Sequence, residues 1–571
     1  MAKRKNPAAA GDRKRKGNFA PSPQPQAATV PADAPPPPAF RTSTSESSAP
    51  HAPALLAYAP AMVLLLIAIL NAVNYTNSDL WGHLRFGADI LANGGHPIRV
   101  DPYSYSIRGL PWIDHEWLSD LLMAKAYAAL GAAGLKIIKL TCAAIAVIFM
   151  AAAVGETGAP VEIQAIVLMA VVIPLTPQME FRPQDFSYAL LSVVMALLAR
   201  DNYRGRAPVW IAIPMMALWS NLHGGFSAGL AALGVYGAAA GVTDAMAGRG
   251  WARGMRFGAI FAAAALMTLA TPFGTGIWYS VAHTISRPRM LEDIVEWQPL
   301  PREIAAIWAR STVDRWFEAL FLGVFAGFAI TVAMIPRGGD TPLVAVGVTM
   351  LCAAFSALRN LALGLIGTAP SLARHAALLA GRFGYLRQAP LPADSGDRRD
   401  GIEQPHMDWF VQGIIALLAI ALAARSGLFS DRIRVDRPEP QGAVAFMREH
   451  GLSGNILAGY NWNDYLLYHF TPGSHVFIDG RYETLYPDRL GLEFADFENN
   501  RPGAVALLNN YPHDFVLLPI HYAPVALLRE SPGWKLIYQD NVAMLFARAD
   551  SPAAHLSGVP VTGTPSPLRF P

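Results

Sequence analysis

The sequence contains little cysteine and little charge. Its two cysteines, Cys142 and Cys352, both lie within apolar runs, which excludes a disulfide framework and a thiolate metal site. Asp, Glu, Lys and Arg make up 15% of the 571 residues, against about 25% in a typical soluble protein. Because 53% of the residues are hydrophobic, the composition excludes a soluble enzyme and a nucleic-acid-binding protein. It indicates a polytopic membrane protein with soluble attachments.

Two ligand-binding motifs are also missing. No glycine-rich loop precedes a predicted helix, so the sequence offers no support for a nucleotide site. No second histidine stands at the His-x-x-x-His spacing that is typical of a helical metal site. We therefore expect neither nucleotide-dependent chemistry nor a helical zinc site.

Apolar segments dominate the middle of the chain and predict about 11 transmembrane helices. They lie at 54–74, 134–154, 161–177, 186–199, 208–221, 226–244, 256–271, 316–336, 341–358, 361–379 and 408–424. Residues 1–53 are instead rich in Ala, Pro and Ser and predict a disordered tail. The first 16 residues of this tail hold seven lysines and arginines against one aspartate.

The arginines of the loops predict the topology, because cytoplasmic loops carry an excess of basic residues. If the basic tail lies inside, four loops that contain arginine fall on the cytoplasmic side. Their arginines lie at 200–206, 249–256, 337 and 382–399. An odd number of crossings then places the C-terminal part outside. The transmembrane domain is predicted at 54–428.

The predicted outer segments differ from the inner loops. The first outer loop, 75–133, contains amphipathic stretches at 80–92 and 114–130, of the kind that lies in a membrane interface. Residues 432–550 alternate strands and helices, which predicts a soluble α/β domain with a mostly parallel small sheet. Its strands are predicted at 455–458, 476–479 and 515–518, with a hairpin at 535–548. Residues 551–571 predict a flexible tail.

Polar residues that topology does not explain gather at the predicted outer ends of the helices. This one-sided set is the strongest functional signal in the sequence. It comprises Asp79, His83, Asp101, His115, Glu116, Glu180, Arg182, Asn221, His223, Glu292, Glu296, Arg359 and Asn360.

Asp79 and His83 follow the first apolar segment and are four residues apart, so a helix there places them on one face. A carboxylate beside an imidazole can take a proton from an acceptor hydroxyl, which makes both of them candidate catalytic residues. The alternative is structural, because Ser78 or Asp79 is also a good N-cap.

Glu116 opens the second amphipathic stretch, within Asp114-His115-Glu116. It is a candidate for acid–base catalysis together with Asp79, or for holding a divalent cation. His115 and Asp101 are candidate substrate-binding residues. In the structural alternative, Asp114 caps the helix and Glu116 favours its positive end.

Arg182 and Arg359 lie on the predicted outer side, against the topology bias. A guanidinium binds phosphate in a bidentate manner, so both arginines are candidate phosphate ligands. The alternative for Arg182 is a salt bridge with Glu180 or another acid, and the alternative for Arg359 is a snorkelling anchor.

Asn221 and His223 precede two glycines, which permit a tight turn and the close approach of a ligand. His223 can donate to a phosphate or sugar oxygen, so both residues are candidate substrate contacts; a plain turn with a packed histidine is the alternative. In the C-terminal part, Asp479 and Arg481 stand at a strand end, where ligands often bind, but a structural ion pair is the favoured interpretation.

With these residues in view, the sequence resembles the GT-C superfamily of integral membrane glycosyltransferases, which use polyprenyl-phosphate-linked sugars. The architecture over 54–550 carries the resemblance. More narrowly, five short strings resemble a group of bacterial membrane proteins of this kind: 79–84 (DLWGHL), 101–105 (DPYSY), 115–118 (HEWL), 221–225 (NLHGG) and 477–481 (FIDGR).

The resemblance implies that Asp79 is the catalytic carboxylate. The family often pairs this acid with a second one nearby, but Leu80 follows Asp79 and no Asp-x-Asp stands in this loop. A divalent metal is therefore an open requirement, with Asp79 and Glu116 as its candidate ligands.

The expected function is the transfer of a sugar from a polyprenyl-phosphate donor to an envelope glycan, lipid or protein acceptor. The expected place is the periplasmic face of a bacterial inner membrane, among membrane lipid and without a nucleic-acid partner. The alternatives are a transporter or flippase and a non-catalytic envelope assembly protein. Convergence of Asp79, Glu116, Arg182 and His223 in one outer cavity favours the enzyme.

Overall fold

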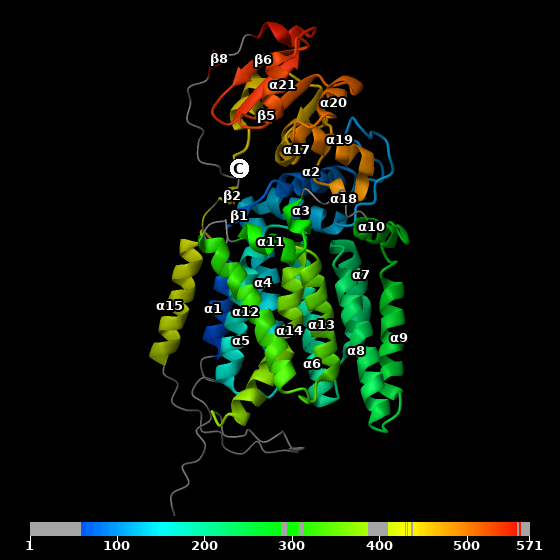
Figure 1. Cartoon of the computed structure of the whole chain (residues 1–571), viewed down its shortest axis with the longest axis vertical. Helices are drawn as coiled ribbons and strands as arrows, with labels where there is room; N and C mark the ends of the chain where they lie inside the picture. Colours follow the sequence, from blue (N-terminus) through cyan, green and yellow to red (C-terminus); the bar gives the residue numbers. More distant parts are fainter. Residues whose placement is uncertain are drawn as a thin grey trace, which may run out of the picture. The chain divides into compact units, whose positions relative to one another are not determined.

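The computed structural model describes residues 59–72, 74–286, 294–307, 312–385, 409–428, 430, 432–435, 438–556 and 559–560 (Figure 1). The predicted N-terminal tail, Glu292 and the residues beyond 560 lie outside the described residues. So do the arginines of the last predicted cytoplasmic loop that follow residue 385.

Each predicted apolar segment contains a helix, because an apolar segment satisfies its backbone polar groups within a helix, and α5 and α14 each tolerate one internal proline. These helices are α1 (Ala59–Leu70), α4 (Ala132–Gly155), α5 (Val161–Leu175), α6 (Gln184–Arg204), α7 (Ala212–Leu222), α8 (Phe226–Met246), α9 (Ala252–Met267), α12 (Thr312–Met334), α13 (Thr341–Ser356), α14 (Leu361–Arg382) and α15 (Trp409–Arg425). In the described part of the chain, four helices are long and apolar enough to cross a membrane. The length and apolar composition of these helices indicate an integral membrane protein. The number of membrane crossings stays a prediction.

The helices run side by side (Figure 1), and all of those named above except α15 contribute to one apolar core. Small residues allow close approach where helices cross. A Cβ added to Gly241 of α8 would lie 3.1 Å from the Cα of Gly254 of α9. The backbones of α8 and α9 are therefore in near contact, and both positions require glycine or a shift of the helices.

The first outer loop forms the two predicted amphipathic helices, α2 (Asp79–Ala92) and α3 (Trp117–Leu130). A Cβ on Gly87 of α2 would clash with the carbonyl oxygen of Asp120 of α3, so these two helices also cross at backbone contact. The outer segments between the later helices form α10 (Gly276–Ile285), η4 (Val295–Trp297), α11 (Leu300–Ile307) and η5 (Leu358–Asn360).

The C-terminal region forms a six-stranded sheet in the order β4-β3-β5-β7-β6-β8. Its strands are β3 (Asn455–Ala458), β4 (His475–Val476), β5 (Phe515–Pro519), β6 (Trp534–Gln539), β7 (Ala543–Arg548) and β8 (Val559–Pro560). Three of the five strand pairs are parallel and two are antiparallel. The sheet is mixed, and β7 of the hairpin β6–β7 takes part in both antiparallel pairs, one with β6 and one with β5.

Helices flank this sheet: α16 (Gln441–Glu449), α17 (Asn463–Phe470), α18 (Tyr482–Leu485), α19 (Asp488–Glu498), α20 (Ala504–Asn510) and α21 (Pro524–Glu530). The strand predicted at 476–479 lies at His475–Val476, and in the turn that follows the carboxylate of Asp479 accepts the backbone N–H of Arg481 (3.0 Å). Part of the predicted flexible tail is ordered, since β8 pairs with β6.

The C-terminal region packs directly on the first outer loop. Trp81 of α2 contacts Tyr465 of α17, with ring centroids 5.0 Å apart. The short strands β1 (Tyr75–Thr76) and β2 (Arg434–Val435) also pair in parallel. Residues 52–571 form one continuous unit, and the domain boundary expected near residue 430 stays a prediction.

Candidate functional site

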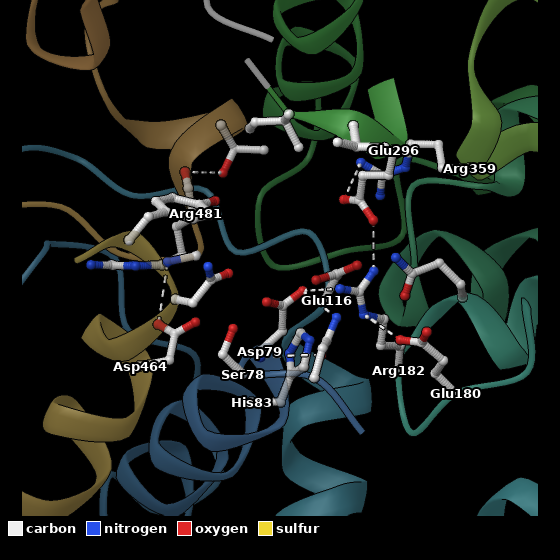
Figure 2. Close-up of a pocket in the computed structure, with 18 of the residues that line it drawn as sticks. Ser78, Asp79, His83, Glu116, Glu180, Arg182, Glu296, Arg359, Asp464 and Arg481 are labelled. Atoms are coloured by element: carbon white, nitrogen blue, oxygen red, sulfur yellow. Dashed lines mark hydrogen bonds and ion pairs between the residues drawn. The ribbon is translucent and has the colours of Figure 1, made fainter. Parts of the chain in front are cut away.

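A cavity of about 560 Å³ lies where the outer loop, the helix ends and the C-terminal region meet (Figure 2). Six of the predicted site residues line it: Asp79, His83, His115, Glu116, Arg182 and Arg359. The turn between α5 and α6 contributes Glu180, and the segment at 294–296 contributes Glu296. Segments more than 350 residues apart in the sequence therefore build one site.

Arg182 is the charged centre of this cavity. Its guanidinium lies 2.7 Å from the carboxylate of Asp79, 2.9 Å from that of Glu296 and 3.3 Å from that of Glu180. The side chain of Arg182 is 15% exposed. The predicted salt bridge with Glu180 is thus one of three, and the arginine faces the cavity rather than lipid (Figure 2).

Glu296 joins the two predicted phosphate ligands. It pairs with Arg182 and, at 3.9 Å, with Arg359, whose guanidinium also lies 4.2 Å from the ring centre of Trp297. Burial raises the pKa of Glu296, but the two guanidinium groups outweigh burial and lower the pKa to about 2. Glu296 therefore stays ionised and holds both arginines on the same wall of the cavity.

Asp79 is the first residue of α2, and its side chain is not used as a helix cap. Ser78 occupies the N-cap position without a side-chain capping bond. Asn77 instead accepts the backbone N–H of Asp79 at 3.2 Å. The carboxylate of Asp79 is 34% exposed and points toward Arg182 across the cavity (Figure 2), so it remains accessible to a substrate.

His83 lines the same cavity, but its partner is not Asp79. Its Nδ1 lies 2.8 Å from the carboxylate of Asp120 on α3. Burial and the nearby charge of Glu116 raise the pKa of Asp120 well above its usual value. The crossing of α2 and α3, which the sequence pattern did not reveal, supplies this acid.

His223 lies behind Glu116, outside the cavity lining. Its Nδ1 accepts the backbone N–H of Gly225 at 3.0 Å and lies 2.7 Å from the hydroxyl of Ser187. That hydroxyl accepts the indole N–H of Trp219, so it can donate its own proton to His223. The remaining nitrogen, Nε2, therefore carries the hydrogen and faces Glu116 at 3.5 Å.

Burial lowers the pKa of His223 well below its usual value, with a further contribution from His115. His223 is therefore neutral, and it acts on the cavity through Glu116 rather than by direct contact. His115 also approaches Glu116, with its Nε2 at 3.7 Å.

Besides His223, two more predicted site residues do not line the cavity. Asp101 is 1% exposed and accepts bonds from Arg481 (2.6 Å) and from the backbone of Ser104 (3.0 Å). Asn221 accepts the indole N–H of Trp117 at 2.8 Å and donates to two backbone carbonyl groups. The structure uses both residues to join segments of the fold.

Arg481 forms the ion pair with Asp479 that the sequence favoured, at 2.5 Å. The guanidinium also lies among the rings of Phe86, Tyr103 and Trp112, between 4.4 and 5.1 Å from their centres. Because Asp101 and these rings belong to the outer loop, Arg481 fastens the C-terminal region to that loop.

The C-terminal wall of the cavity escaped sequence analysis. It presents Glu439, Tyr460, Asn461, Trp462, Asp464, Thr484, Glu498 and Tyr522. Asp464 accepts the backbone N–H of Gly480 at 3.2 Å, and burial raises its pKa well above the usual value, with further contributions from Asp479 and Asp79. A Cβ on Gly82 would lie 2.9 Å from the carboxyl carbon of Asp464. Gly82, within the string 79–84, is therefore needed for the close approach of Asp464 to α2.

A divalent metal does not fit the side chains as they stand. Across the described ranges, no three His, Cys, Asp or Glu side chains converge to hold a metal ion. The candidate ligand Asp79 is paired with Arg182, and Glu116 lies against two histidines.

Comparison with known proteins gives the fold. No family model matches the chain, and no curated protein matches it in sequence. The archaeal oligosaccharyltransferase AglB from Archaeoglobus fulgidus, solved with an inhibitory peptide and a dolichol-phosphate, is similar in structure with a TM-score of 0.52 at 12% identity. The match covers 81% of this chain and 69% of that chain.

The apo form of the same archaeal enzyme matches with a TM-score of 0.52 at 12% identity, over 90% of this chain and 76% of that chain. ArnT from Cupriavidus metallidurans, bound to undecaprenyl phosphate, matches at 14% identity with a TM-score of 0.42, over 88% of this chain and 99% of that chain. The likeness to AglB shows that this membrane protein has a GT-C-like fold.

Proposed function

We propose that this protein is a membrane glycosyltransferase that moves a sugar from a polyprenyl-phosphate donor to an acceptor hydroxyl or amide. The observation that carries the proposal is the convergence of Asp79, Arg182, Glu296 and Arg359 in one cavity at the end of the helices. AglB, which shares the fold, was solved with a dolichol-phosphate.

The two arginines provide the phosphate site. A guanidinium has five N–H donors, more than one carboxylate can accept, and Glu296 fixes the positions of Arg182 and Arg359. As the bond between the sugar and the phosphate breaks, negative charge grows on the leaving phosphate. Preorganised positive charge at that place lowers the barrier.

Asp79 is the proposed base. The acceptor attacks the anomeric carbon, the carbon–oxygen bond to the phosphate breaks, and the acceptor proton passes to the carboxylate of Asp79. His83, oriented by Asp120, is the second candidate for this proton. The aromatic and acidic wall from the C-terminal region faces Asp79 and contacts the acceptor, which is an envelope glycan, lipid or protein.

The proposal includes the topology expected from the loops. The N-terminus is cytoplasmic, the chain from 54 to 428 is embedded in a bacterial inner membrane, and residues 432–550 are periplasmic. Arg200, Arg204, Arg249, Arg253 and Arg256 all lie on α6, α9 or the loop before α9, away from the cavity, which supports a cytoplasmic side there.

The substitution Asp79→Asn tests the function. Polyprenyl-linked lipids and envelope glycans are compared by mass spectrometry in wild type, in a deletion strain, and in the deletion strain complemented with the variant. We expect the deletion to remove one sugar from a glycan and the variant to restore less than about 1% of it, because a positioned base contributes about 100-fold or more.

Asp89→Asn is the matched control. Asp89 lies on the same helix, binds Arg85 and Tyr103, and does not line the cavity, so this variant should restore the glycan. Full activity of Asp79→Asn would refute the catalytic assignment. Unchanged glycans in the deletion strain would instead favour a transporter, a flippase or an assembly protein.

A further inference from the structure

A second cavity, of about 460 Å³, lies at the opposite end of α6 from the first. Gln184, at the start of this helix, lines the first cavity, and Asp201, near its end, lines the second. A helix of 21 residues is about 30 Å long. Figure 1 shows the connection between α8 and α9 at the end of the bundle away from the C-terminal sheet. The second cavity is therefore separate from the proposed active site.

Arginines dominate the walls of this cavity. The carboxylate of Asp201 accepts bonds from Arg253 (2.9 Å), from Arg256 and from the hydroxyl of Tyr236 (3.0 Å). Arg249, a third arginine, pairs with Asp244 at 2.7 Å. Two guanidinium groups share the single charge of Asp201, so positive charge is left over in the cavity.

The exposure of these arginines shows that they do more than neutralise Asp201. Asp201 is 1% exposed, and Arg253, at 23%, already neutralises it. Arg256 and Arg249 are 45% and 64% exposed, so their remaining donors can reach solvent. The N-terminal end of α9, close to Arg253 and Arg256, adds its positive helix end to the same place.

The surroundings of the cavity are apolar. Met246, Trp251 and Met255 are 85%, 55% and 67% exposed, and they lie on or beside the helix ends that form it. Exposed tryptophan is typical of the boundary between lipid headgroups and acyl chains. The arginines thus lie at headgroup depth, beside side chains that suit acyl chains.

We propose that this cavity binds the phosphate of an anionic phospholipid in the cytoplasmic leaflet. Basic pockets between membrane helices on that side bind anionic headgroups. Arg249 and Arg256 contact the phosphate, Asp201 holds Arg256 in place and is itself bound by Arg253, and the acyl chains follow the outer surface of α8 and α9. The proposal does not depend on the transferase function.

Native mass spectrometry of the full-length protein in detergent tests this site. The protein is titrated with phosphatidylglycerol, with phosphatidylcholine, and with phosphatidylglycerol in the presence of millimolar inorganic phosphate. We expect preference for phosphatidylglycerol and no displacement by phosphate. The variant Arg249→Gln/Arg256→Gln should bind phosphatidylglycerol about 30-fold more weakly, from about 1 kcal/mol per arginine.

The matched control is Arg200→Gln/Arg204→Gln, which removes two arginines that pair with Glu156 and do not line the cavity. This variant should bind as wild type does. Equal binding by all three proteins, or equal binding of both lipids by wild type, would overturn the proposal. Displacement by inorganic phosphate would overturn the lipid as the source. If the double variant does not fold, Arg249→Gln alone leaves the Asp201 pairs intact and should weaken binding about fivefold.

Discussion

The two ends of α6 lie beside two clusters of ion pairs with opposite charge at their centres. At the outer end, three carboxylates surround Arg182, whereas at the other end two arginines and a tyrosine surround Asp201. A buried charge requires a partner, so a pair alone says little about function. At the Asp201 end the arginines are in excess and remain able to bind an anion, whereas at the outer end the carboxyl groups are in excess.

The outer cavity has an excess of acids, and this shapes the proposed chemistry. Its nine carboxyl groups face three arginines; they are Asp79, Asp114, Glu116, Asp120, Glu180, Glu296, Glu439, Asp464 and Glu498. Burial raises the pKa of Asp114, Asp120 and Asp464 well above the usual value, which favours their neutral form. The proposed phosphate site lies where Arg182 and Arg359 stand together, and these three acids add no repelling charge to it in their neutral form.

The largest stability effect is expected at the outer end, from Arg481→Gln. This change leaves the buried carboxylates of Asp101 and Asp479 without their guanidinium partner. Removing one member of a buried ion pair costs about 3–5 kcal/mol. Thermal unfolding in detergent measures the loss, and hydrogen exchange should show the C-terminal region opening first. A change below about 1 kcal/mol would show that Arg481 does not fasten this region to the outer loop.

An intermediate effect is expected from His223→Gln, and it depends on pH. Folded His223 stays neutral because burial lowers its pKa, whereas in the unfolded chain it binds a proton below about pH 6.5. The unfolded state then holds more protons, so stability falls as the pH drops below that value, by up to about 1.4 kcal/mol per pH unit.

Melting temperatures of wild type and His223→Gln at pH 7 and pH 5 measure this contribution. The variant should lose less stability on acidification. Burial also lowers the pKa of His513 to about 4, but His513 is present in both proteins and cancels in the comparison. Equal losses would show that His223 is not the neutral, buried histidine described above.

The smallest effect is expected at the opposite end, from Arg204→Gln. Arg204 is 59% exposed and pairs with Glu156 at 2.8 Å. Because solvent screens such pairs, the expected change in the free energy of unfolding is below about 1 kcal/mol. A larger loss in a denaturant titration would mean that the exposed arginines at this end hold the fold together, as Arg481 does at the outer end.

Much of the fold follows from local patterns. The apolar runs predicted the helices, and the periodicity of the outer loop predicted α2 and α3 to within a few residues. The pairing of β7 with β5 was not predicted, because these strands are not adjacent in the sequence. Local propensity contains no information on that choice.

The candidate site was also predicted only in part, because local patterns select single residues and not their contacts. Outer position and charge were enough to select Asp79, Glu116, Arg182 and Arg359, which all line the cavity. Position and charge did not distinguish these four residues from Asp101 and Asn221, which form hydrogen bonds with other parts of the fold and do not line the cavity. No sequence pattern pointed to Asp464 of the C-terminal region, because its place in the cavity depends on contacts with α2 and Gly480.

The sequence by itself determined that this is a helical membrane protein with polar chemistry on one side, because hydrophobicity and charge act on each segment wherever it lies. Only the tertiary structure decided which charges meet. Arg182 pairs with Asp79 and Glu296 over 103 and 114 residues of chain, and His83 pairs with Asp120 on another helix. Such pairings depend on distances of a few ångströms, which the crossing of helices sets and the local sequence does not.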